Sequence, residues 1–178
     1  MAKPLVGIIM GSDSDLEVMQ EAFKFLEDNE IPTEIKIVSA HRTPDMMVRY
    51  AKDARKKGMR VIIAGAGGSA HLPGMVASFT TLPVVGVPIH TKNLSGIDSL
   101  LSIVQMPPGI PVACVAINGA LNAALLACQI LGLNSKKIES MIEEYKKSLQ
   151  SSVVEKSSQL ERYGPSKYQK LNRALVEK

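Results

Sequence analysis

Short runs of consecutive apolar residues alternate along this chain with segments that repeat apolar residues at helical spacing. The runs predict five buried strands, at residues 5–10, 35–38, 61–64, 83–87 and 111–117. A strand that is apolar at every position is typical of a parallel sheet covered on both faces. Helices between such strands make right-handed connections. The pattern therefore predicts an α/β fold, a three-layer, doubly wound, five-stranded parallel sheet of flavodoxin-like or Rossmann-like order.

Helix start and stop signals stand beside the first two predicted helices. Ser14 and Glu17 have the spacing of a capping box before an apolar helical face. Thr43 followed by Pro44 predicts an N-cap and a first helical position. Gly58 is the expected C-cap of that second helix.

The C-terminal part of the pattern differs from the rest. Residues 120–131 are apolar nearly all round, which predicts a helix that another subunit helps to bury. A further helix starts at Ser135, and its periodicity weakens after residue 150. We therefore expect a single α/β catalytic domain at 1–150 and a C-terminal helical tail at 151–178 that packs on a neighbouring subunit.

Composition narrows the class of protein. The chain has 178 residues, of which 46% are hydrophobic, enough for one well-buried core. It has no apolar run of about 18 residues, and its N-terminus does not resemble a secretory signal. We expect a cytoplasmic protein without a membrane partner. Cys114 and Cys128 lie in apolar segments without C-x-x-C spacing, so reduced core thiols are expected and a zinc site is not.

The net charge of +4 comes entirely from the C-terminal part. Residues 1–135 have 11 basic and 11 acidic side chains, whereas residues 136–178 have 10 and 6. No aromatic-interleaved basic face accompanies this excess. We therefore expect no nucleic-acid partner.

Polar and glycine-rich turns follow the first four predicted strands. Because the carboxyl ends of parallel strands meet at one edge of a sheet, where ligands bind, we expect these turns to form a single site. The candidate site residues are Gly11, Ser12, Ser14, Asp15, Ser39, Ala40, His41, Arg42, Ala66, Gly67, Gly68, Ser69, Ala70, His71 and Leu72.

The side chains of the first two turns suit a ribose phosphate. Ser12 and Ser14 precede a helix, where hydroxyls and free amides favour phosphate, although they could equally serve only as helix caps. Arg42 can hold an anion, and Asp15 can accept both hydroxyls of a sugar diol. His41 can move protons near neutral pH.

The glycine-rich turn after the third strand lets a backbone approach a ligand closely. No Gly-Lys-Ser/Thr follows, so it is not a Walker loop. His71 could orient a ligand or cap a turn. Residues 89–98 are expected to form a mobile loop, with His90 solvated.

Four motifs carry a specific resemblance. The segments at 11–15, 39–44, 64–75 and 105–107 resemble, in order and spacing, the N5-carboxyaminoimidazole ribonucleotide mutase family of purine biosynthesis. The resemblance covers roughly residues 5–150. It implies a flavodoxin-like subunit of a homo-octamer, an isomerase that moves a carboxylate from the exocyclic nitrogen of a small ribonucleotide to ring carbon four, with no cofactor and no metal.

The resemblance also implies roles for individual residues. His41 matches the catalytic histidine, and Ser12, Asp15 and Arg42 match nucleotide-binding positions. The turn at 67–71 matches the wall where carbon dioxide is held, and main-chain N–H groups there are expected to hold the transient carboxylate. The turn at 118–122 departs from the family pattern, because it is shorter and poorer in glycine.

Two alternatives remain. A related carboxylase class uses carbon dioxide directly, but generally has Lys in place of the Arg of the His-Arg turn and a different sequence at the glycine-rich turn. Arg42 and His71 favour the mutase. A non-catalytic nucleotide-binding module could share the fold. A receiver module would need an Asp at the end of the third strand, where Gly65 and Ala66 stand.

Overall fold

Five parallel strands form one sheet within residues 3–176, the part of the chain that the computed structural model describes. Their order is β2-β1-β3-β4-β5, and every neighbouring pair is parallel. This is the flavodoxin-like order, which decides between the two predicted arrangements. The strands are β1 (Val6–Met10), β2 (Thr33–Ile37), β3 (Val61–Gly67), β4 (Val84–Ile89) and β5 (Ala113–Cys114).

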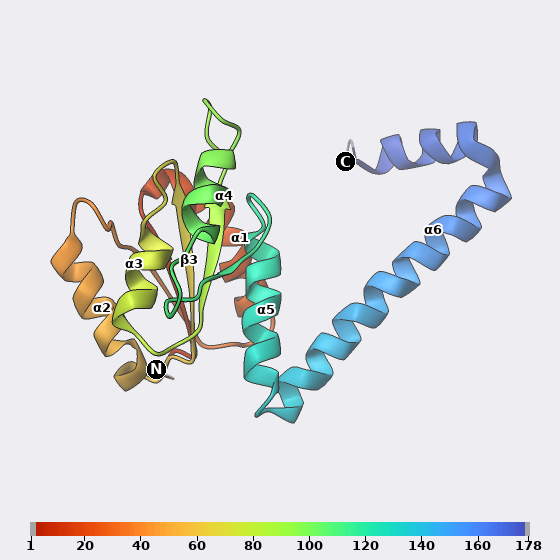
Figure 1. The fold of residues 1–178 in the computed structure, drawn as a ribbon. Helices are drawn as coiled ribbons and strands as arrows, with labels where there is room; N and C mark the ends of the chain where they lie inside the picture. Colours follow the sequence, from red (N-terminus) through yellow and green to blue (C-terminus); the bar gives the residue numbers. More distant parts are fainter. Residues whose placement is uncertain (1–2, 177–178) are drawn as a thin grey trace.

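Helices cover both faces of the sheet, so the predicted three-layer, doubly wound fold is confirmed (Figure 1). Helices α1 and α5 pack on one face, and α2, α3 and α4 pack on the other. The helical elements are η1 (Asp13–Asp15), α1 (Leu16–Asp28), α2 (Pro44–Lys57), α3 (Leu72–Phe79), α4 (Ile97–Val104), α5 (Ala120–Gly132) and α6 (Lys136–Val176).

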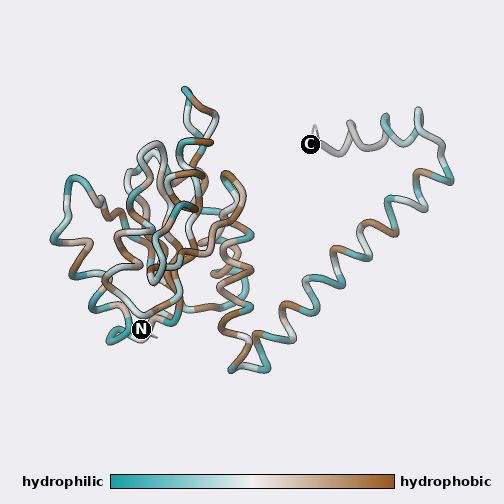
Figure 2. The backbone as a smooth tube through the Cα atoms, in the orientation of Figure 1, coloured by the Kyte–Doolittle hydropathy of each residue, from teal (hydrophilic) through white to brown (hydrophobic). Residues whose placement is uncertain are grey.

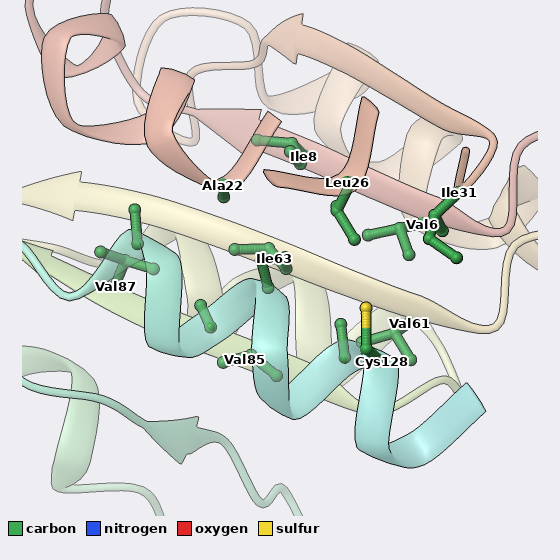
Figure 3. Close-up of a cluster of buried hydrophobic side chains, with 14 of the residues drawn as sticks. Val6, Ile8, Ala22, Leu26, Ile31, Val61, Ile63, Val85, Val87 and Cys128 are labelled. Atoms are coloured by element: carbon green, nitrogen blue, oxygen red, sulfur yellow. The ribbon is translucent and has the colours of Figure 1, made fainter. Parts of the chain in front are cut away.

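The apolar runs of the central strands are buried on both sides, as predicted. On β1, Val6 and Ile8 face the core beneath α1 and α5, while Ile9 faces the core beneath α2 and α3. Figure 3 shows the first of these cores, where Cys128 of α5 lies near Val61 of β3. Burial raises the pKa of the Cys128 thiol to about 11. A thiol with this pKa stays protonated at neutral pH, in agreement with a core residue.

A glycine on β3 allows α1 to lie close to the sheet. A β-carbon at Gly65 would stand only 2.4 Å from Sδ of Met19 on α1, so no larger residue fits without displacing that buried side chain. The close contact fixes the start of α1 beside the carboxyl end of β3. It also brings the turn after β1 next to the glycine-rich turn.

Some predicted boundaries were wrong. The capping box is formed by Ser12 and Asp15, two residues earlier than predicted, because the chain begins its helical turn as the 3-10 turn η1. Thr43 precedes α2 but makes no side-chain cap bond to it, whereas Gly58 ends that helix with φ +107 as predicted. Strand β5 has only two residues, Ala113 and Cys114, at the edge of the sheet, whereas residues 111–117 were predicted.

Helix α6 leaves the domain and extends away from it (Figure 1). Its first turns cover α5 through buried Ile138 and Ile142, so the chain itself supplies part of the cover that was expected from another subunit. The helical tail is confirmed through Val176, with a break at Gly164. Residues 1–2 and 177–178, at the ends of the predicted domain and tail, lie outside the described residues.

Beyond its first turns, α6 alternates polar and apolar residues in solvent (Figure 2). Val153 and Val154 are 66% and 61% exposed, and Leu149 and Leu160 are also exposed. A second set of exposed apolar side chains, Leu94, Ile97, Leu101 and Val104, lies on and just before α4. Within residues 3–176, no helix combines the length and the apolar character needed to cross a membrane.

Candidate active site

A cavity of about 610 Å³ lies at the carboxyl ends of the strands. Its volume is within the range of about 300–1,000 Å³ that is typical of small-molecule sites. The turns after β1, β2 and β3 meet there, as predicted. The lining residues are Gly11, Ser12, Ser14, Asp15, Ser39, Ala40, His41, Arg42, Ala66, Gly67, Ser69, His71, Leu72, Ile89, His90 and Thr91.

Two predicted residues do not line this cavity, and three lining residues were missed. Gly68 and Ala70 lie behind the wall, where Ala70 is buried. Ile89, His90 and Thr91 complete the wall from the end of β4. The turn after the fourth strand was expected at this sheet edge, but its residues were not proposed for the site, because His90 was expected to be solvated. His90 is exposed as predicted, but it stands at the cavity wall.

The turn after β1 is held by bonds among its own residues. The Ser12 amide donates to Oδ2 of Asp15 over 3.2 Å, and the Ser14 hydroxyl donates to Oδ1 over 3.3 Å. The Ser12 hydroxyl accepts from the Ser14 amide, so it does act as a cap. Burial raises the pKa of the Asp15 carboxyl above its ordinary value, against the opposing effect of these hydrogen bonds. Asp15 is thus a fixed acceptor at the cavity floor.

Arg42 joins the turns after β1 and β2. Its Nη2 donates to the Gly11 carbonyl over 2.9 Å, and its amide donates to the Ser39 hydroxyl over 3.1 Å. Nε lies 3.4 Å from the same hydroxyl. These contacts orient the guanidinium with neutral partners, which leaves its charge free to attract an anion in the cavity.

His41 and His71 meet across the cavity. Nε2 of His41 lies 2.8 Å from Nδ1 of His71, and the rings are inclined at 81°. One proton fits between these two nitrogens, so each imidazole fixes the tautomer of the other. His71 stands at the N-terminus of α3 but makes no side-chain cap bond. Of the two uses that the sequence left open for His71, the capping one is therefore wrong.

Three amides of the glycine-rich turn have hydrogen-bond partners within the protein. The Ala70 amide donates to the Gly68 carbonyl over 2.8 Å, and the His71 amide donates to the Ser69 carbonyl over 2.7 Å. The Gly68 amide donates to the hydroxyl of Ser99 over 2.9 Å. The role of main-chain N–H groups in holding a carboxylate stays a prediction, and these three amides have partners within the protein. They shape the wall.

A family model for AIR carboxylase matches residues 5–152. The chain belongs to the AIR carboxylase family. Among relatives, it is 60% identical to the N5-carboxyaminoimidazole ribonucleotide mutase of Pyrococcus horikoshii, over 93% of this chain and 94% of the other. It is 55% identical to the phosphoribosylaminoimidazole carboxylase of Candida glabrata, over 93% of this chain and 29% of that longer protein.

A solved structure from this family has the same fold. The crystal structure of Treponema denticola PurE is 32% identical, with a TM-score of 0.80, over 88% of this chain and 98% of that chain. The family is named for a carboxylase, and its members that resemble this chain are named as mutases or as carboxylases. The distinction between the two activities therefore depends on residues of the cavity.

The short turn at Asn118 supports the cavity from behind. Asn118 has φ +57, and its Oδ1 accepts the His90 amide over 2.8 Å. Its own amide donates to the Pro88 carbonyl over 2.8 Å. The turn thus fixes the exit of β4 at the point where the chain reaches the cavity wall.

Among the described side chains, no group of three or more His, Cys, Asp or Glu residues could hold a metal ion. His41 and His71 form a pair, but no third ligand joins them among the residues that the structure describes.

Proposed function

We propose that this protein is an N5-carboxyaminoimidazole ribonucleotide mutase, an isomerase of de novo purine biosynthesis. The observation that carries the proposal is the pair of His41 and His71, 2.8 Å apart, in a cavity that also contains Arg42 and Asp15. These groups supply a proton carrier, an anion-binding charge and an acceptor for hydroxyls.

The substrate is a small ribonucleotide. Ser12, Ser14 and Arg42 bind its phosphate, because hydroxyls and a guanidinium donate to phosphate oxygens. Asp15 binds the ribose hydroxyls, since its oxygens accept hydrogen bonds at the cavity floor. Gly11, Ser39 and Ala40 complete this side of the site.

The reaction proceeds by decarboxylation and recarboxylation. The carbamate C–N bond breaks, carbon dioxide forms, and the exocyclic nitrogen takes a proton from His41. Ring carbon four then forms a C–C bond to carbon dioxide and carries both hydrogen and carboxylate. His41, now neutral, removes that hydrogen as a proton and restores aromaticity. One proton is given and one is returned, so the isomerisation needs no cofactor.

Carbon dioxide is held between the two steps at the wall formed by the glycine-rich turn. Ala66, Gly67 and Leu72 present small or apolar groups there, while Ser69 and His71 provide polar ones. A site that excludes water keeps carbon dioxide near carbon four and favours recombination over escape. Gly68 and Ala70 contribute from behind this wall.

The carboxylase class and a non-catalytic nucleotide-binding module are the competing functions. Arg42 and His71 favour the mutase over the carboxylase, because the sequence of both turns follows the mutase pattern. The histidine pair favours an enzyme over a binding module, since a module that only binds a nucleotide has no use for a proton carrier.

We further propose a cytoplasmic homo-oligomer, with an octamer as the expected state. The catalytic domain comprises residues 1–150, and the tail at 151–178 packs on a neighbouring subunit. The exposed apolar side chains of α6 and α4 support self-association, because a stripe of this kind is stabilised when another surface removes it from water.

The test supplies the purified chain with N5-carboxyaminoimidazole ribonucleotide, without ATP, biotin or added metal. We expect interconversion with 4-carboxy-5-aminoimidazole ribonucleotide in both directions. Turnover only of the uncarboxylated nucleotide with carbon dioxide or bicarbonate would establish the carboxylase instead. Nucleotide binding without any turnover would establish the binding module.

A further inference from the structure

Ser99 is a fully buried serine in the first turn of α4. Its hydroxyl accepts the Gly68 amide over 2.9 Å and donates to the Ile89 carbonyl over 2.6 Å. Both bonds reach outside its own helix, to the chain that leaves β3 and to the end of β4. A buried hydroxyl with one donor and one acceptor partner has a fixed orientation.

The place of Ser99 in the sheet explains these two partners. Gly67 and Ile89 are the last paired residues of β3 and β4, and both line the cavity. Beyond this pair the strands separate, and Gly68 turns away with φ +66. The Ser99 hydroxyl stands between the Gly68 amide and the Ile89 carbonyl, and so joins the two strands where they diverge.

The same turn of α4 holds further groups around the cavity. The carboxylate of Asp98 accepts from the Thr91 hydroxyl over 2.8 Å, and Thr91 lines the cavity. The Ser102 hydroxyl lies 3.2 Å from the Gly68 carbonyl. The shorter bond of the Ser102 hydroxyl is to the Asp98 carbonyl, over 2.7 Å. The bond from the Gly68 amide to Ser99 is therefore the main contact between this turn and α4.

We propose that Ser99 is a positioning residue for the carboxylate transfer, one that holds the glycine-rich turn against Ile89 and so closes the carbon dioxide site between β3 and β4. The inference rests on the proposed mutase function. Ser99 does not touch the cavity, and it acts through Gly68 and Ile89. Its role is to retain carbon dioxide rather than to bind the nucleotide.

Removal of the Ser99 hydroxyl is expected to let water into the carbon dioxide site and carbon dioxide out of it. Ser99→Ala leaves a buried N–H and a buried C=O without their shared partner, which is costly unless water replaces it. The space left by one oxygen, next to two polar groups, favours entry of water as the turn moves. Carbon dioxide then exchanges with solution before it recombines.

The experiment follows the origin of the transferred carbon. The enzyme converts unlabelled N5-carboxyaminoimidazole ribonucleotide in the presence of ¹³C-bicarbonate and carbonic anhydrase, and mass spectrometry measures label in the carboxylate of the first product formed. We expect wild type to retain the substrate carbon. Label in the Ser99→Ala product should rise about tenfold, with a similar fall in kcat and little change in KM.

Two further variants separate positioning from general stability. Ser99→Thr keeps the hydroxyl and should restore most of the carbon retention. Ser78→Ala is the matched control, because Ser78 on α3 is exposed and its hydroxyl bonds only to Met75 of its own helix. It should label like wild type. If Ser99→Ala does not fold, Ser99→Cys, with a weaker hydrogen-bonding group, serves in its place.

The outcomes distinguish this inference from the proposed function. A wild type without mutase activity would overturn the proposed function and the inference together. If wild type is active and the Ser99→Ala product contains as much label as the wild-type product, the inference alone would be overturned. The same comparison applies to Ser99→Cys if Ser99→Ala does not fold. Full exchange in wild type would also overturn it, because no closed site would then exist.

Discussion

The two walls of the cavity are built in different ways. The wall from the turns after β1 and β2 presents side chains. Arg42 bonds across to the turn after β1, Asp15 accepts within its own turn, and both line the cavity. The wall from the glycine-rich turn presents mostly backbone and small groups, and three of its amides are bonded within the protein. We infer from this difference that the first wall binds the nucleotide and the second wall encloses carbon dioxide.

The largest expected effect comes from the residue that stands between the walls. His41→Asn removes the proton carrier, so we expect turnover to fall by about 10²- to 10⁴-fold. Nucleotide affinity, measured by calorimetry, should change little because Arg42 and Asp15 remain. His71→Asn should lower turnover less, since His41 can still take a proton. A variant without His41 that keeps near-normal turnover would contradict the proposed role.

The next largest effect tests whether the first wall binds the nucleotide. Arg42→Ala should weaken nucleotide affinity by about 2–3 kcal/mol, the value of a hydrogen-bonded charged group. Calorimetric titration measures this directly. Arg49→Ala is the matched control, because Arg49 is an exposed arginine on α2 that does not line the cavity. Equal affinity in wild type and Arg42→Ala would exclude an anion-binding role.

A smaller effect is expected from the cap of η1. Ser12→Ala removes the acceptor of the Ser14 amide, and the free energy of unfolding should fall by about 1 kcal/mol. Urea denaturation measures the change. Ser148→Ala, at an exposed serine of α6 whose hydroxyl bonds to Tyr145, should have almost no effect. A variant as stable as wild type would show that the cap contributes only to ligand binding.

The smallest expected effect is a change in how stability depends on pH. Because burial raises the pKa of Asp15, its contribution to stability is fully present below the ordinary value of 3.8 and is lost as the pH rises through the raised pKa. Asp15→Asn does not titrate. Relative to wild type, its free energy of unfolding should therefore increase as the pH rises through this window. A constant difference across a pH series of denaturation curves would contradict this.

The sequence predicted the sheet because its central strands are apolar at every position. Val6 to Met10 has no polar residue, and the same holds for the start of β3. Strand β5 was predicted too long, since a run of apolar residues resembles a strand even where only two of its residues pair with the neighbouring strand. The tail was harder to predict because exposed apolar residues weaken the helical pattern that identifies a packed helix.

The sequence predicted the cavity only through the turns that follow the strands, because these turns meet at one edge of the sheet. Ser12 and Asp15 follow the buried strand β1, so the position of their turn was clear. Arg42 follows β2, whose residues are half-buried or exposed, and its turn was found from the apolar residues of that strand. The contact of His41 with His71 depends on how α3 starts, which no local pattern gives over 30 residues of separation. Ser99 was missed because a single serine in an apolar helix resembles any tolerated polar residue, and its partners are 31 and 10 residues away.

The long helix α6 determines how the isolated chain behaves in solution. From Lys136 to the break at Gly164 it rises about 1.5 Å per residue, a reach of roughly 40 Å. A compact chain of 178 residues would have a radius of gyration of only about 16 Å. A single subunit should therefore scatter X-rays as an elongated particle. Enclosure of α6 by other subunits would make the assembly more nearly spherical than its parts.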